Sequence, residues 1–125
     1  MLEQYIQQLP GVKASYPFGK QVCVYKVVGK MFALLTEGQL PQQISLKALP
    51  ADVTFLIDQF EAVSPGYHLN KKHWITVSLH SSTDATSNAG SELSENMLQD
   101  LVSASYALVV AKLTRADKAL LESVS

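Results

Sequence analysis

Apolar and polar residues recur along this chain with two periods, one typical of helices and one typical of strands. Near the amino terminus, apolar residues follow the i, i+3, i+4, i+7 spacing of one helical face. Pro10-Gly11 ends the helix that this spacing predicts over residues 1–9. The same period predicts helices over residues 50–62 and 92–113, and a short last helix after residue 114.

The later helices carry recognisable terminal signals. Pro50 stands where a first-turn proline is tolerated, and Ser91 can cap the long third helix. Thr114 and Asp117 resemble a capping box in front of the last helix. The residues expected to face the core are Leu93, Met97, Leu101, Ala104 and Leu108, with Leu98, Val102, Ser105 and Val109 beside them, and then Ala119 and Leu120.

Alternation with period two predicts strands over residues 13–19, 21–28, 31–37, 43–49, 67–69 and 73–80. Because Pro17 cannot donate to a ladder, the first strand belongs at an edge of the sheet. Gly29-Lys30 has the length of a two-residue hairpin loop in which glycine supplies the positive φ. Asn70-Lys71 has the chemistry of a further turn.

These turns decide which side chains share a face of the sheet. With Gly29-Lys30 as the loop, the core-like face holds Cys23, Tyr25, Val27, Phe32, Leu34 and Thr36. The opposite, mixed face holds Val22, Val24, Lys26, Val28, Met31, Ala33, Leu35 and Glu37. In the last strand the expected core-facing set is His73, Ile75, Val77 and Leu79, and the outward set is Lys72, Trp74, Thr76, Ser78 and His80.

The elements follow in the order α-β-β-β-β-α-β-β-α-α over residues 1–125, the length of one domain. Strands and helices do not alternate one for one. We therefore expect an α+β fold, with an antiparallel sheet of five to six strands and the helices packed on one face. Residues 81–91 are polar and of low complexity, and we expect a flexible loop there.

Composition narrows the function classes. Hydrophobic residues make up 47% of the chain and charged residues 17%, which excludes global disorder. The net charge of −1 is not typical of a strong nonspecific nucleic-acid binder. Charge is nevertheless uneven, since residues 13–72 carry seven lysines and four acids, whereas residues 73–125 carry three bases and six acids.

The expected location follows by elimination. Cys23 is the only cysteine, so an intramolecular disulfide is impossible. The amino terminus lacks the basic and apolar regions of a signal peptide. No apolar run approaches the roughly 20 residues that span a bilayer. We therefore expect a cytoplasmic protein without a membrane segment.

The chain contains no evident catalytic or metal-binding pattern. His68 and His73 flank a turn, but no third ligand lies near them, and a closed zinc site requires four. Cys23 falls on the core face, where a thiol is inert. The Gly-Lys pairs at 19–20 and 29–30 are isolated and form no phosphate-binding loop. We expect no enzyme activity, no metal and no cofactor.

Lysines at hairpin tips are the first candidate for a binding surface. Lys20, Lys30, Lys71 and Lys72 occupy such tips, where they can contact phosphates. Lysine is also common at exposed turns and protects sheet edges, so this pattern has a purely structural explanation as well. In an up-and-down meander, Lys20 and Lys30 fall at opposite ends of the sheet.

The outer face of the sheet is the second candidate. Alternation directs toward it Lys26, Lys47, Lys72, Trp74 and Thr76. An aromatic ring beside lysines can stack a base while the lysines follow the backbone. The alternative is that the rest of the chain covers Trp74.

Six stretches span nearly the whole chain: "LPGV" (9–12), "YPFG" (16–19), "VYKVVGKMFAL" (24–34), "ISLKALP" (44–50), "VSPGYHLNKKHWITVSL" (63–79) and "SYALVVAKL" (105–113). In sequence and order they resemble the MmcQ/YjbR family of small bacterial proteins, and "PGYHLNKKHW" is the most specific of them. The resemblance implies helices packed on an antiparallel sheet. This fold is similar to that of type III secretion chaperones and has been likened to a double-wing DNA-binding module.

The resemblance favours a non-enzymatic DNA-binding module, although fold analogy alone does not establish function. The expected contact residues are Lys20, Lys26, Lys30, Lys47, His68, Lys71, Lys72 and Trp74. One alternative is a protein- or peptide-binding module that uses the open sheet face. With either function we expect a monomer or weak dimer. Another is a small-molecule site lined by Tyr67, His68, His73 and Trp74.

Overall fold

The structure, a computed structural model, describes residues 2–37, 42–66, 69–79 and 94–124. Within them the helices are α1 (Leu2–Gln8), α2 (Pro50–Gln59), α3 (Glu95–Ala111) and α4 (Arg115–Val124). The strands are β1 (Val12–Ser15), β2 (Val22–Val27), β3 (Lys30–Thr36), β4 (Gln42–Lys47), β5 (Val63–Pro65) and β6 (Trp74–Leu79). This confirms the predicted α+β class and element order. The expected flexible loop, residues 81–91, lies outside the described residues.

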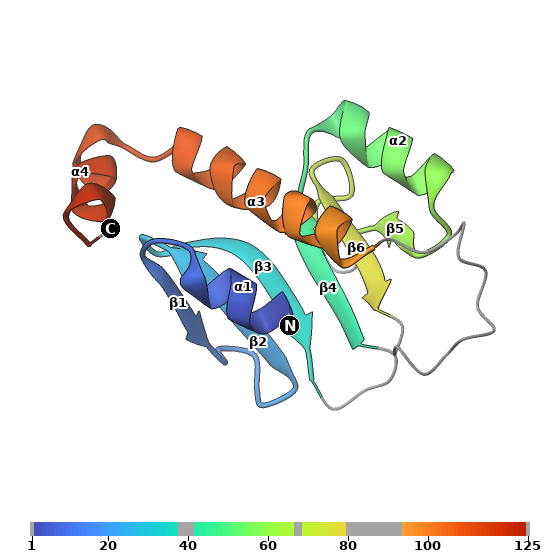
Figure 1. The fold of residues 1–125 in the computed structure, drawn as a ribbon, viewed down its shortest axis with the longest axis horizontal. Helices are drawn as coiled ribbons and strands as arrows, with labels where there is room; N and C mark the ends of the chain where they lie inside the picture. The colour runs from blue at the N-terminus through green and yellow to red at the C-terminus, as the bar shows by residue number, and fades with distance from the viewer. Residues whose placement is uncertain (1, 38–41, 67–68, 80–93, 125) are drawn as a thin grey trace.

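The strands form one antiparallel sheet in the order β1-β2-β3-β4-β6-β5. Figure 1 shows α1 and α3 lying across one face of this sheet, α2 beside β5, and α4 beyond the end of α3. As predicted, β1 is an edge strand, but it ends before Pro17. The face opposite α1 and α3, hereafter the outer face, carries the residues discussed below.

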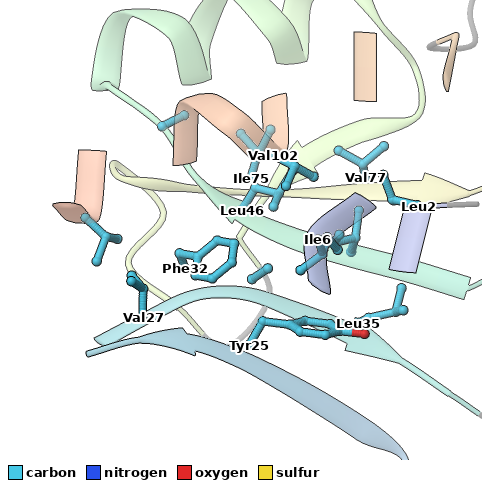
Figure 2. Packing of buried hydrophobic residues seen from close by; sticks show 14 of the residues in the cluster. Leu2, Ile6, Tyr25, Val27, Phe32, Leu35, Leu46, Ile75, Val77 and Val102 are labelled. Atoms are coloured by element: carbon cyan, nitrogen blue, oxygen red, sulfur yellow. The ribbon is translucent and has the colours of Figure 1, made fainter. Parts of the chain in front are cut away.

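The core fills the space between the sheet and the helices α1 and α3. Figure 2 shows Tyr25 and Leu46 of the sheet gathered with Ile6 of α1 and Val102 of α3, all almost completely buried. Burying one such large apolar side chain contributes about 1.5–3 kcal/mol. The ring of Phe32 also meets the ring of Tyr106 edge-on, with centroids 5.4 Å apart. Neither α1 nor α3 covers the outer face.

The β2–β3 hairpin turns one residue earlier than predicted. Lys30 belongs to β3 and lies opposite Val27, so the loop is Val28-Gly29 rather than Gly29-Lys30. Both loop residues have positive φ, 47° at Val28 and 75° at Gly29, as a type I′ turn requires. A β-branched residue is rare in that conformation, which is why the sequence pointed to the wrong pair.

A β-bulge then changes the facing of β3. Tyr25 lies opposite Ala33, but the next residue, Lys26, lies opposite Met31, which leaves Phe32 as the extra residue. The predicted core residues Cys23, Tyr25, Val27 and Phe32 are buried, and this part of the prediction is confirmed.

Beyond the bulge, the predicted facing of β3 is wrong. Ala33 and Leu35 are buried in the core, whereas Leu34 is only half-buried and lies opposite Val24 and Ser45 on the outer face. One inserted residue shifts the period-two alternation by one position, so every later side chain changes face. In β6, which has no such shift, Ile75 and Val77 are buried in the core as predicted.

The strand that pairs with β6 lies earlier in the chain than predicted. The short strand β5 (Val63–Pro65) pairs with β6, in the segment directly after predicted helix 50–62, where a turn and not a strand was expected. Leu69, expected in a strand, lies in a bend, and Tyr67 and His68 lie outside the described residues. Three residues bounded by proline carry too little alternation to be recognised.

Of the two adjacent stripes predicted for the long helix, the structure buries the second one against the sheet. Val102, Ser105 and Val109 are buried, whereas Met97 is 38% exposed. The helix begins at Glu95, where the side chain of Ser94 accepts a hydrogen bond from the Met97 amide. The expected cap, Ser91, lies outside the described residues.

The last helix has the predicted start and a different inner face. The hydroxyl of Thr114 accepts a hydrogen bond from the Asp117 amide at 3.1 Å, as expected of an N-cap. Leu121 is buried, whereas Leu120 is 59% exposed and Ala119 is also exposed, so the predicted facing is wrong. Helix period fixes the spacing of a stripe, but its phase depends on what the helix packs against.

Candidate functional site

Most of the candidate lysines lie at one end of the sheet. Strand pairing places Lys13 opposite Lys26, and Lys30 begins β3 at the same end. Antiparallel pairing brings the last residue of β4 and the loop before β6 to this end as well. We call this group the lysine rim; its members are Lys13, Lys26, Lys30, Lys47, Lys71 and Lys72. Figure 1 shows the β2–β3 hairpin, the end of β4 and the start of β6 at one end of the sheet.

Lys20 does not belong to the rim. It precedes β2, whereas Lys30 follows the hairpin after β2, so the two lie at opposite ends of the strand, as predicted. Lys20 is exposed, and its nearest strand neighbours are at the end of the sheet where β3 finishes. His68, the remaining candidate in this part of the chain, lies outside the described residues.

A well-defined turn holds the two lysines before β6. The Asn70 side chain accepts a hydrogen bond from the Lys72 amide at 2.9 Å, and the Asn70 carbonyl accepts one from the His73 amide at 3.1 Å. These bonds form the expected asparagine turn and leave Lys71 and Lys72 exposed. Lys26 and Lys47 are half-buried along the strands, where their methylene stems can cover apolar surface.

Trp74 faces outward, opposite Lys47, but its side chain is covered. Only 8% of the residue is exposed. The backbone approaches it closely at Gly66, where an added Cβ would lie 2.5 Å from the Trp74 Cβ. The Gly66 amide also donates to the Trp74 carbonyl at 2.9 Å. The alternative reading of Trp74, as a ring covered by the chain, therefore matches the structure, and no open indole face is available to stack a base.

The outer face contains an open hollow of about 870 Å³. Its floor crosses the middle of the sheet, where Leu34, Ser45 and Thr76 lie side by side in neighbouring strands. Phe18, 70% exposed, stands at one border, and Lys71 stands at the border formed by the loop before β6. Its size is within the range of roughly 300–1,000 Å³ typical of small-ligand sites.

The loop that carries Phe18 is tied to the end of β3. The Tyr16 hydroxyl donates a hydrogen bond to the Glu37 carboxylate at 2.9 Å, and the Glu37 amide donates to the Gln21 carbonyl at 2.6 Å. The bond to Glu37 is the main reason that the pKa of Tyr16 rises to about 12, since ionisation would remove the donor and place two negative groups together. Phe18 thus sits on an anchored loop.

The remaining candidate residues form no catalytic or metal-binding site within the described ranges. Cys23 is 2% exposed and belongs to the core cluster. Within the described ranges, no three side chains of the metal-binding types lie close enough to hold an ion, and none of the helices there is long and apolar enough to cross a membrane. His73 is half-buried and, like Trp74, does not line the hollow, so the pocket expected from these two residues is not the one observed.

Two residues of these surfaces were missed from the sequence. Lys13 pairs with Lys26, and alternation from the edge strand could have placed it on the outer face. Phe18 falls within the strand predicted over residues 13–19. The available signal was its place between Pro17 and Gly19, two residues that favour a turn over a strand.

Two solved structures share the fold. The Deinococcus radiodurans protein DR2400, with a DUF419 domain, superposes with a TM-score of 0.79 at 34% identity, covering 97% of this chain and 85% of that one. A Pseudomonas syringae protein superposes with a TM-score of 0.65 at 25% identity, covering 84% and 92% of the two chains.

Comparison of sequences also identifies similar proteins. The chain is 37% identical over 111 residues to uncharacterized protein YbdF of Escherichia coli O157:H7, covering 89% of this chain and 83% of the relative. It is 32% identical over 120 residues to uncharacterized protein YjbR of Escherichia coli K12, covering 96% and 93%. The YjbR family model matches residues 7–108. The chain therefore belongs to the YjbR family.

Proposed function

We propose that this protein is a non-enzymatic DNA-binding module that contacts the phosphate backbone through the lysine rim. The observation that carries the proposal is the concentration of six lysines at one end of a sheet in a chain whose net charge is −1. Ammonium groups held along one edge can follow a line of phosphates without reading bases.

The pair Lys13 and Lys26 gives further support. These residues lie directly opposite each other in neighbouring strands. Like charges in that position destabilise a sheet, and an anion bound between them would remove the repulsion. Sites where a local folding rule is broken are often functional.

The salt dependence of DNA affinity tests the proposal. If about four rim lysines neutralise phosphates, log K should fall with log salt concentration with a slope near −3.6. Fluorescence anisotropy with a random-sequence duplex measures this slope. Lys30→Gln should reduce its magnitude by about 0.9, and Lys20→Gln, at the opposite end of the sheet, is the matched control that should leave it unchanged. Absence of binding at tens of micromolar protein and low salt would refute the proposal.

Protein or peptide binding on the open sheet face is the competing function. It is favoured by the absence of a helix over the outer face within the described residues, and by the exposed Phe18 at its border. Light scattering after size exclusion separates the two. A dimer that buries the outer face would support the competing function, and a monomer that binds duplex DNA would support the first.

A further inference from the structure

The hollow on the outer face combines an apolar wall with one cation. Met31 and Leu34 form part of its floor, and Phe18, which is 70% exposed, also lines it. At the other border Lys71 is the only charged residue among the described residues that line the hollow. No carboxylate lies among them, so nothing there opposes a negative ligand.

The polar part of the floor is already ordered. The hydroxyls of Ser45 and Thr76 are hydrogen-bonded to each other at 2.9 Å across β4 and β6. The Ser64 hydroxyl donates to the Thr76 carbonyl at 3.3 Å. Hydroxyls held in rigid strands can orient a ligand without first losing side-chain freedom.

From this arrangement we propose that the hollow binds a small organic anion, with an aromatic or other apolar body against Phe18, Met31 and Leu34 and its carboxylate or similar group at Lys71. The assignment is independent of DNA binding. Lys71 contributes to both surfaces, but Phe18 belongs only to the hollow and Lys30 belongs only to the rim. A predominantly apolar concave site with few polar groups is the usual form of a small-molecule site.

Titration of the folded protein with naphthoate, followed by amide chemical shifts, tests the proposal. Naphthoate supplies the apolar body and the carboxylate, and naphthamide is the neutral probe of the same shape. Shifts should cluster at Leu34, Ser45 and Thr76 on the floor of the hollow. The amide should bind about fivefold more weakly, since it lacks a charge to pair with an exposed lysine.

Matched variants separate the two halves of the site. Phe18→Ala should weaken naphthoate binding about fivefold through lost apolar contact. The control Phe55→Ala, at a phenylalanine of α2 that is 60% exposed against 70% for Phe18, should leave binding unchanged. Lys71→Gln should weaken naphthoate but not naphthamide, and its neighbour Lys72→Gln should affect neither. Both lysines are exposed, so these changes leave the core intact.

Four results would overturn the proposal. These are shifts confined to the rim lysines, equal affinity for naphthoate and naphthamide, no response to Phe18→Ala, and occupation of the hollow by a peptide or a second copy of the chain in place of naphthoate. Lys30→Gln should leave naphthoate binding nearly unchanged while it weakens DNA binding. Loss of one activity without the other therefore distinguishes failure of this site from failure of the DNA proposal.

Discussion

Replacing Ser105 with alanine should destabilise the fold strongly, although the change removes a single oxygen atom. The Ser105 hydroxyl donates to the Phe32 carbonyl at 2.6 Å and accepts from the Lys47 amide at 2.9 Å. Ladder pairing ends at Ala33 and Leu46, so these two backbone groups are the next pair that β3 and β4 would otherwise share. The fully buried hydroxyl thus takes the place of a strand-to-strand hydrogen bond.

The expected cost is the sum of two lost hydrogen bonds at a buried position. Each buried backbone group left without a partner costs about 1–3 kcal/mol. Alanine recovers about 0.5 kcal/mol through its better helix propensity. Since two groups are affected, we expect Ser105→Ala to lower the free energy of unfolding by about 1.5–5.5 kcal/mol.

Urea unfolding followed by the fluorescence of the single tryptophan, Trp74, measures this change. The denaturant slope should stay constant while the midpoint falls. The control is Ser123→Ala, whose exposed hydroxyl bonds only the Leu120 carbonyl of its own helix, and whose effect should be below about 0.5 kcal/mol. If Ser105→Ala cost no more than Ser123→Ala, then β3 and β4 would have closed to pair directly, and the bridging role of Ser105 would be refuted.

Three further predictions concern single contacts. The pKa of Tyr16 is raised from 10.0 to about 12 in the folded protein. Its bond to Glu37 therefore stabilises the fold fully below pH 10, and this stabilisation is lost as the pH rises through 12. Glu37→Gln should lower the pKa of Tyr16, as measured by a tyrosinate absorbance titration. Gly66→Ala should cost about 1–3 kcal/mol in urea unfolding, because its methyl group would collide with Trp74, and an unchanged midpoint would contradict the close approach. Tyr106→Phe keeps the ring contact but loses the hydrogen bond to the loop after α1, so it should cost about 1 kcal/mol. An equal loss in Tyr106→Leu and Tyr106→Phe would show that the ring contact contributes nothing.

The element order was predictable because each element has its own local signal. Period-two alternation in β6 places Ile75 and Val77 in the core, and no turn or bulge within the strand disturbs it. Asparagine chemistry identified the turn at Asn70 in the same way. Signals of this kind lie within a few residues of the structure that they specify, so a single sequence is sufficient to read them.

The facing of β3 could not be predicted because it depends on contacts made far along the chain. The sequence gives no reason for Val28 to adopt a positive φ or for Phe32 to form a bulge. Ser105, which satisfies the backbone at the bulge, is 73 residues away from Phe32. Tertiary contacts of this kind override local propensity. The same limit applied to α3, where the buried position of Ser105 fixed the phase of the helix.

The bulge also explains why the outer face has an apolar floor. Met31 and Leu34 are three positions apart, so in a regular strand they would point to opposite faces. The extra residue Phe32 between them restores a common direction, and both line the hollow. Ser105 of α3 bonds the backbone of β3 and β4 from the face that the helices cover. It therefore supports the bulge that gives the outer face its apolar floor. It follows that Ser105→Ala should weaken naphthoate binding in the fraction that remains folded, because Met31 and Leu34 lose their common direction when the bulge relaxes. A destabilising change away from the bulge, such as loss of the α4 cap in Thr114→Ala, should not weaken it.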